Sequence, residues 1–240
     1  MKFGDICKLS GYGPITFPPD SHRWVVVARE PCLAGTGGAR GSRFRAFTGY
    51  FFAALGCQCG HPLHGVARHL QTARGVSDAE RLKRVNDFFN RQIRFGEDSA
   101  IWNQPDYWAT PLETLGLGSG DCEDFSIAKY YSLKEAGVAP EKLRLIYVRA
   151  KIGTSDAVAS QAHMVLAYYA KPEAEPLVLD NMVSEIRPAS RRPDLVPVFS
   201  FNSAGVFTGV SGNEATPAAG TGRLSRWEDL LKRAKAEGFE

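Results

Sequence analysis

A glycine-rich turn leads into an acidic helix start at Gly116–Phe125, where the chain reads Gly-Leu-Gly-Ser-Gly-Asp-Cys-Glu-Asp-Phe. Cys122 stands in the first turn of the predicted helix, where backbone N–H groups have no partners within the helix. The helix dipole is positive at that end and stabilises a thiolate. Glycines let the backbone come close to a ligand or substrate. The pattern predicts that Cys122 is a reactive thiol.

Two later residues extend this pattern to that of a cysteine hydrolase. His163 lies inside a strand-like apolar run, and Asp180 ends another such run. A thiol needs a base to become a nucleophile, and the base needs a partner that fixes its orientation. We interpret Cys122 as the nucleophile, His163 as the base and Asp180 as the orienting carboxylate. Taken singly, the three residues also fit a small core residue, a core histidine and a turn cap.

The same chemistry requires donors for the oxyanion of the tetrahedral intermediate. The backbone N–H of Cys122 is one natural donor. The second donor is not evident from the sequence, and the upstream candidates are Trp102, Asn103 and Trp108.

Acidic residues surround the thiol, since Asp121, Glu123 and Asp124 all lie within two positions of Cys122. Carboxylates beside a thiol raise its pKa and so oppose the effect of the helix. Acids at a helix start also complement the dipole. Their oxygens equally suit a hard cation such as calcium, which would neutralise the charge beside the thiol. The residues alone leave helix capping and a calcium site as equal alternatives.

Composition narrows the class of protein. The chain has 240 residues, 44% of them hydrophobic and 23% charged, which is ordinary for a soluble globular protein. A net charge of +3 is too small to indicate binding to nucleic acid. Of the five cysteines, only Cys122 lies after residue 75, which suits a single functional thiol better than a disulfide framework.

We expect three regions along the chain. Residues 1–75 are rich in Gly, Pro and Arg and are expected to be poorly ordered. Within them, residues 40–57 resemble a degenerate export signal or, alternatively, a buried element of an N-terminal subdomain. The pair Cys57 and Cys59 is too closely spaced to favour a zinc site. Residues 76–205 form the predicted catalytic domain, and residues 206–240 a linker and a C-terminal helix.

Capping patterns and apolar periodicity predict the elements of that domain. Helices are expected at residues 78–94, at 110–116 and at 122–136, with a last helix that opens on a capping box at 225–228. Strands are expected at residues 143–151, 164–169, 177–179 and 196–201, followed by a linker at 203–222. Helices that precede antiparallel strands indicate an α+β fold.

Several motifs in this order resemble the bacterial transglutaminase-like cysteine proteinase family, which includes the periplasmic adhesin proteases of the LapG type. The resemblance covers about residues 77–205. It rests on residues 85–90, 106–111, 120–125, 162–166 and 177–181, and on the later runs 188–195 and 200–202.

The resemblance implies a papain/transglutaminase-like core, with the helix that carries the nucleophile packed on an antiparallel sheet. It implies Cys122, His163 and Asp180 as the triad, and calcium held by Asp121, Glu123 and, less directly, Asp124. It further implies a periplasmic protein that cleaves the N-terminal region of a large surface adhesin and so controls biofilm attachment. An inner-membrane receptor for cyclic di-GMP would sequester it. The front of the chain departs from the family pattern, and without export the protein would be cytoplasmic.

Two other functions use the same features. A transglutaminase-like acyltransferase would employ the same triad with an amine as the final acceptor in place of water. A binding module with a degenerate site would have no use for a complete set of cysteine, histidine and aspartate. The sequence favours a calcium-dependent cysteine endopeptidase.

Overall fold

The structure is a computed structural model, and it describes residues 76–153, 159–207 and 224–239. The expectations for residues 1–75, including the export signal and the pair Cys57 and Cys59, lie outside the described residues. No helix within the described ranges combines the length and the apolar character that a membrane span requires.

Along the described chain the main sheet follows a first group of helices and precedes a last helix, as the sequence predicts. The helices are α4 (Asp78–Gln92), α5 (Asp98–Ile101), α6 (Pro111–Leu117), α7 (Cys122–Glu135) and α8 (Ser225–Ala236), with short 3-10 turns η1 (Pro140–Lys142) and η2 (Ala189–Arg191). A first pair of strands is formed by β1 (Arg94–Phe95) and β2 (Ser119–Gly120). The main strands are β3 (Leu143–Ile152), β4 (Ala159–Tyr168), β5 (Leu177–Leu179), β6 (Arg187–Pro188), β7 (Leu195–Asn202) and β8 (Gly205–Phe207).

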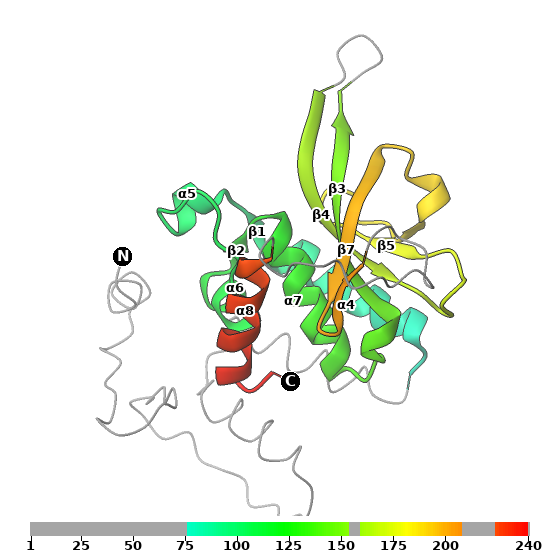
Figure 1. Cartoon of the computed structure of the whole chain (residues 1–240), viewed down its shortest axis with the longest axis horizontal. Helices are drawn as coiled ribbons and strands as arrows, with labels where there is room; N and C mark the ends of the chain where they lie inside the picture. The colour runs from blue at the N-terminus through cyan, green and yellow to red at the C-terminus, as the bar shows by residue number, and fades with distance from the viewer. Residues whose placement is uncertain (1–75, 154–158, 208–223, 240) are drawn as a thin grey trace, which may run out of the picture.

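The main sheet is antiparallel throughout, in the order β6-β5-β4-β3-β7-β8. Helix α7 lies between this sheet and α4, and α8 lies on the same side of the sheet (Figure 1). This is the predicted α+β architecture, with the helix that carries Cys122 packed on an antiparallel sheet.

Helix α7 is the centre of the hydrophobic core. Its sequence is apolar over a wide arc, and the structure buries its residues from Asp124 to Leu133 without interruption. Side chains of β3, β4 and β7 meet it from the sheet, among them Leu145, Met164 and Phe201. A second, smaller cluster, which includes Ile146, Val148 and Val165, covers the opposite face of the sheet. Alternate residues of β3 therefore pack into the main core on one face of the sheet and into the smaller cluster on the other.

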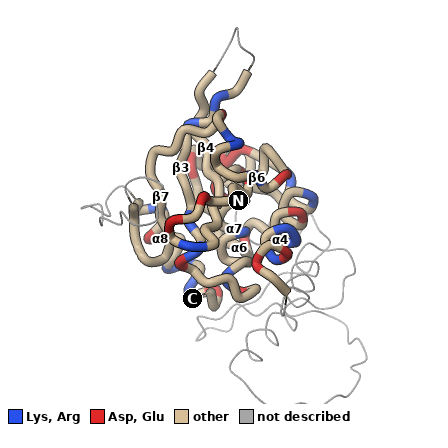
Figure 2. Tube along the Cα trace, turned by 90° about the vertical axis from the view of Figure 1, so that its right-hand side faces the viewer, with Lys and Arg blue, Asp and Glu red and all other residues tan. Residues whose placement is uncertain are grey.

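Helix α4 begins as the sequence predicts. The hydroxyl of Ser77 accepts a hydrogen bond from the N–H of Glu80 at 3.4 Å, and Leu82, Phe88 and Phe89 are among the residues buried on the inner face. Ion pairs four residues apart hold the outer face, one of them between Lys83 and Asp87 at 2.7 Å. Figure 2 shows basic and acidic residues interspersed along this helix. The outer face of α4 is therefore a solvated surface.

Three helix ends differ from the prediction. Helix α4 ends at Gln92 and not at residue 94, where β1 begins. Helix α6 continues through Gly116 to Leu117, because Gly118, at φ +62°, takes the left-handed position that ends a helix. Helix α8 has Leu224 and not Ser225 at its N-cap, and no side chain caps it. Leu224 is buried, and its carbonyl accepts the N–H of Glu228 at 3.0 Å, so burial of the leucine starts the helix one residue earlier than the capping pattern.

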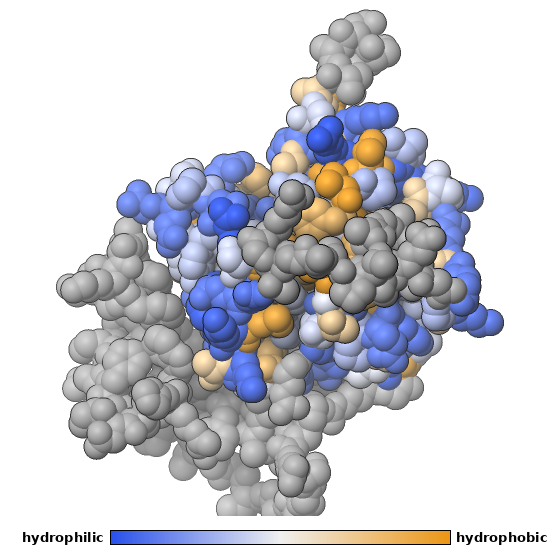
Figure 3. Space-filling model, in the orientation of Figure 1, coloured by the Kyte–Doolittle hydropathy of each residue, from blue (hydrophilic) through white to orange (hydrophobic). Residues whose placement is uncertain are grey.

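The sheet is longer than the apolar runs predict. Strand β4 starts at Ala159, because exposed residues before His163 continue the ladder opposite the end of β3. Strand β8 takes up residues that were expected to belong to the linker, and it pairs with the last three residues of β7. The first half of β7 faces solvent, with Val196 and Val198 exposed, and Figure 3 shows apolar side chains on that part of the surface.

Candidate active site

The turn before α7 holds Cys122 in place through its backbone. Strand β2 pairs in parallel with β1, so Gly120 is fixed beside Phe95. Asp121 is the N-cap, and its Oδ1 accepts the N–H groups of Glu123 at 3.1 Å and of Asp124 at 3.3 Å. In the opposite direction, Oδ2 of Asp124 accepts the N–H of Asp121 at 3.3 Å. This capping box places Cys122 at the first position of α7, as predicted.

His163 and Asp180 are brought together by neighbouring strands. His163 lies on β4 opposite Val148, and Asp180 follows the last residue of β5. The Nε2 of His163 lies 2.8 Å from Oδ1 of Asp180, and both side chains are almost fully buried. The N–H of Met182 donates to the same Oδ1 at 3.0 Å. These contacts favour the tautomer with the proton on Nε2, which leaves Nδ1 as the acceptor.

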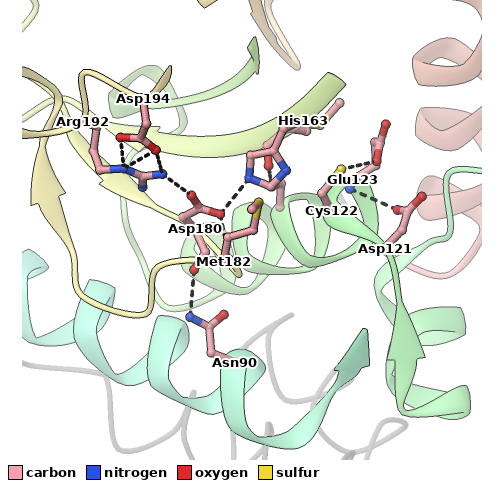
Figure 4. Close-up of polar contacts among 11 residues, drawn as sticks. Asn90, Asp121, Cys122, Glu123, His163, Asp180, Met182, Arg192 and Asp194 are labelled. Carbon is pink, nitrogen blue, oxygen red and sulfur yellow. Dashed lines mark hydrogen bonds and ion pairs between the residues drawn. The ribbon is translucent and has the colours of Figure 1, made fainter. Parts of the chain in front are cut away.

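The thiol lies on the other side of this histidine. The hydroxyl of Ser126 donates to the carbonyl of Met164 at 3.0 Å, and this bond fixes the first turn of α7 against β4. The backbone of Met164 also approaches Cys122, which partly opposes the rise in the thiol pKa that burial and Glu123 cause. In Figure 4 the imidazole of His163 lies between Asp180 and Cys122. The structure therefore gathers the three predicted residues into one site.

The environment of the thiol is acidic. Burial and, after it, the charge and hydrogen bond of Glu123 raise the pKa of Cys122 far above its usual range. The thiol donates to Oε2 of Glu123 at 2.7 Å. In this arrangement the thiol proton is held by the carboxylate and not by the imidazole of His163. Neutralisation of Glu123 would release it.

Carboxylates also gather beneath this turn. Oxygen atoms of Asp98, Asp121 and Asp124 lie within 4.8 Å of one another, and those of Asp121 and Glu123 form a second such group with the sulfur of Cys122. Burial, followed by repulsion from neighbouring carboxylates, raises the pKa of Asp121. Burial also raises the pKa of Asp98 and of Asp124, and hydrogen bonds from Tyr107 and Ala109 only partly offset it.

This donor set suits a hard cation. Asp98 is 4% exposed, and its Oδ1 is buried without a hydrogen-bond partner among the described residues. A buried anionic oxygen without a partner is costly, and a cation with oxygen ligands removes that cost. Asp121, Glu123 and Asp124 were predicted from the sequence, whereas Asp98 was not. The parallel pairing of β1 with β2 brings Asp98 to this turn, and a two-residue strand leaves no periodic signal in the sequence.

Two residues around Asp180 were also missed. The guanidinium of Arg192 donates from Nη2 to Oδ2 of Asp180 at 2.8 Å, and both side chains are buried. The side-chain amide of Asn90, on α4, donates to the backbone carbonyl of Asp180 at 2.8 Å. Burial opposes the ionisation of Asp180, but the bonds from His163, Met182 and Arg192 outweigh it and lower its pKa to about 2. Asp180 is therefore held as a carboxylate.

The candidates for a second oxyanion donor lie in different surroundings. Asn103 is exposed and has a φ of 54°. The ring of Trp102 packs at a tilt against that of Tyr107, and the buried Trp108 stacks against Phe201 with 5.7 Å between ring centroids. Both indole nitrogens are buried without a hydrogen-bond partner within the described ranges. The choice of donor stays a prediction.

Comparison with known proteins identifies the class of this site. A family model described as bacterial transglutaminase-like cysteine proteinase matches residues 57–193. The chain belongs to this family. The proteinase thus has a cysteine peptidase site on a transglutaminase-like fold.

Solved structures agree with this assignment. LapG of Legionella pneumophila is 33% identical, with a TM-score of 0.63, and the match covers 79% of the proteinase and 96% of that chain. The EGTA-treated form of the same LapG gives a TM-score of 0.65, and the calcium-bound form 0.64, each at 33% identity over 79% of the proteinase and 96% and 97% of those chains. A search of curated proteins finds no match.

Proposed function

We propose that the proteinase is a calcium-dependent endopeptidase in which Cys122 is the nucleophile, His163 the general base and Asp180 the orienting carboxylate. One observation carries this proposal. The bond of 2.8 Å between Nε2 of His163 and Asp180 leaves Nδ1 as the proton acceptor of a ring that lies between Asp180 and Cys122. A transglutaminase-like cysteine peptidase needs this order of groups to activate its thiol.

The reaction follows from the position of each group. Nδ1 of His163 takes the thiol proton, and the sulfur attacks the scissile carbonyl. The N–H of Cys122, at the first position of α7, stabilises the oxyanion because the helix offers it no acceptor. The imidazolium, stabilised by Asp180, then gives its proton to the leaving amine, and an acyl-enzyme remains. Water, deprotonated by the same imidazole, hydrolyses the thioester and restores the thiol.

Calcium would be held by the carboxylates of Asp121, Glu123 and Asp124, with Asp98 as an additional ligand. When bound, the ion would neutralise the negative charge that raises the pKa of the thiol. Engagement of Glu123 would remove the acceptor that now holds the thiol proton at 2.7 Å. The calcium-bound form of the Legionella LapG supports this proposal.

The substrate, compartment and regulator are proposed on the same family resemblance. The substrate would be the N-terminal region of a large surface adhesin, whose cleavage releases the adhesin and weakens biofilm attachment. Such a substrate places the proteinase in the periplasm. An inner-membrane receptor that senses cyclic di-GMP would sequester it there.

The test is cleavage of an adhesin N-terminal fragment by the full chain. Wild type, Cys122→Ala and His163→Gln are each assayed with calcium and with a chelator, and the products are analysed by mass with and without an added primary amine. Cleavage only by wild type with calcium, at a product mass that the amine does not change, is the expected result. Incorporation of the amine would favour the acyltransferase, and cleavage by Cys122→Ala would overturn the proposal.

A further inference from the structure

The second oxygen of Asp180 has a charged partner of its own. Oδ1 accepts the bonds from His163 and Met182, whereas Oδ2 accepts the bond of 2.8 Å from Nη2 of Arg192. The side chains of Asp180 and Arg192 are 0% and 3% exposed. A buried carboxylate with one free oxygen can rotate about its side-chain bonds, and it is costly to keep ionised. With both oxygens bound, it presents a single orientation to the imidazole.

Arg192 is itself held in one orientation by Asp194. Its Nε donates to Oδ1 of Asp194 at 3.0 Å, and its Nη2 donates to Oδ2 at 2.8 Å. The backbone on either side is fixed as well. Arg192 ends the turn η2, and the carbonyl of Asp194 accepts the N–H of Lys151, on β3, at 2.8 Å. The guanidinium is therefore fixed to the sheet through Asp194, and it fixes Asp180 in turn. Figure 4 shows Asp194, Arg192, Asp180 and His163 joined in a row by these bonds.

The charges of this row are balanced for the reaction. Asp180, Arg192 and Asp194 together carry one negative charge, which offsets the imidazolium that forms when His163 takes the thiol proton. Without Arg192, the buried and ionised Asp180 would have no hydrogen-bond donor for its Oδ2 from this side chain. The carboxylate would then turn or take up a proton, and in either case the orientation of His163 would be lost.

We infer that Arg192, held by Asp194, is a positioning residue that fixes Asp180 and, through it, the catalytic orientation of His163. The inference rests on the proposed function and extends the triad to a row of five residues. Lysine should replace the arginine only in part, because an ammonium keeps the positive charge but lacks the planar fork that binds two carboxylates at once. Loss of this residue acts on the chemical step and leaves substrate binding unchanged.

The test compares Arg192→Gln and Arg192→Lys with Arg191→Gln, a matched control one residue earlier with an exposed side chain. For each full-length variant, kcat and KM for the adhesin fragment are measured in calcium, together with the downfield proton resonance of the His163 Nε2–H, assigned by its absence in His163→Gln. We expect kcat to fall about 100-fold for Arg192→Gln, as for a misplaced catalytic group, with an unchanged KM and loss of the resonance. Arg192→Lys should be intermediate, and Arg191→Gln should match wild type.

A second variant keeps the inference testable where Arg192→Gln does not fold. Asp194 is 39% exposed and Arg192 keeps its bond to Asp180, so Asp194→Asn loosens the guanidinium without leaving a buried charge unpaired, and it should lower kcat in the same sense. A folded Arg192→Gln or Asp194→Asn with wild-type kcat and resonance would overturn the inference. If wild type does not cleave but Arg192→Gln alone still loses the resonance, the proposed function fails and the positioning role stands.

Discussion

At the scale of single residues, Lys129 is a buried ionisable residue that has no role in the proposed reaction. It lies on α7, its side chain is 1% exposed, and burial lowers its pKa to about 7, although Asp180 opposes the shift. Between that pH and 10.5 the unfolded chain holds a proton that the folded chain has released, so this residue makes stability rise with pH. Lys129→Met should therefore stabilise the protein most at pH 7 and below, by about 1.4 kcal/mol for each unit of pKa shift removed.

The measurement is urea unfolding of wild type and Lys129→Met across that range of pH. The advantage of the variant should shrink as the pH rises and vanish near 10.5. Lys83→Met is the control, because the side chain of Lys83 is 68% exposed and its ammonium stays in solvent in both states. An advantage of Lys129→Met that does not change with pH would show that packing, and not the buried charge, is the cause.

Asp98 is the residue through which the calcium proposal can be tested by stability. Asp98→Asn removes a carboxylate whose pKa burial raises, so the variant should be more stable than wild type in chelator. In calcium the order should reverse, since a ligand at about 100 times its Kd contributes about 2.7 kcal/mol, and a tenfold weaker Kd removes about half of that. Thermal unfolding in chelator and in calcium measures both effects.

The exposed Asp106, paired with Arg226 at 3.1 Å, provides the control for this experiment. Asp106→Asn should respond to calcium as wild type does. A calcium response of Asp98→Asn equal to that of wild type would remove Asp98 from the ligand set and leave Asp121, Glu123 and Asp124.

The site residues that were predicted are marked by local sequence patterns, whereas those that were missed are not. The roles proposed for Cys122, His163 and Asp180 require one another, so a glycine-rich turn and two strand-like runs were enough to select these residues. Arg192 and Asp98 come to this site through contacts that no local pattern encodes. Arg192 reaches Asp180 from the end of a three-residue turn, and Asp98 follows a two-residue strand that pairs across the chain.

At the scale of elements, the junction between β2 and α7 depends on the missing side chain of Gly120. A Cβ at this position would lie 2.6 Å from Cβ and 2.8 Å from Oδ2 of Asp124. Gly120→Ala would therefore push Asp124 away from the N–H of Ala109 and disturb the capping box that holds Cys122. We expect a loss of about 1–3 kcal/mol in the free energy of unfolding, as for overpacking, and reduced peptidase activity.

Gly116 is the matched control, because it lies within α6 and a Cβ at its position would meet no atom of a neighbouring element within 4 Å. Gly116→Ala should stabilise the chain by about 0.5–1 kcal/mol, since alanine loses less entropy than glycine in a helix. Urea unfolding of the two variants should give shifts of opposite sign. A Gly120→Ala variant that is as stable as wild type, or more stable, would mean that the β2–α7 junction tolerates a side chain.

The elements that the sequence predicts are those with a repeated signal. Helices α4 and α7 and strands β3 and β5 lie within a few residues of their predicted positions, because capping residues, helical periodicity or an apolar run mark them. The short strands β1, β2, β6 and β8 were not predicted, since none of them, unlike β5, contains a run of three apolar residues. Their positions depend on pairing with distant segments, which the local sequence does not specify.

At the scale of the whole molecule, the C-terminal helix is joined to the catalytic core. Arg233, on α8, donates to Glu113 at 2.8 Å and to the carbonyl of Trp108 at 2.7 Å. Glu237, at the end of the same helix, accepts the hydroxyl of Thr110 at 2.6 Å. These contacts reach the start of α6, just upstream of the turn that carries the thiol. Helix α8 therefore supports the active-site side of the molecule.

Trp227 provides a test of the contact between α8 and the catalytic core. It is 4% exposed, its ring lies 5.1 Å from that of Phe201 and 6.0 Å from that of Tyr130, and its Nε1 donates to the carbonyl of Asn202 at 3.2 Å. Trp227→Ala would leave a cavity between α7, α8 and β7 and should cost roughly 3–5 kcal/mol in the free energy of unfolding. Trp227→Phe keeps an aromatic ring and loses the hydrogen bond, so it should cost less.

Urea unfolding followed by circular dichroism should give one cooperative transition, shifted most in Trp227→Ala, because α8 and the sheet share one core. A midpoint that stays in place while only helix signal is lost would mean that α8 unfolds separately from the catalytic core.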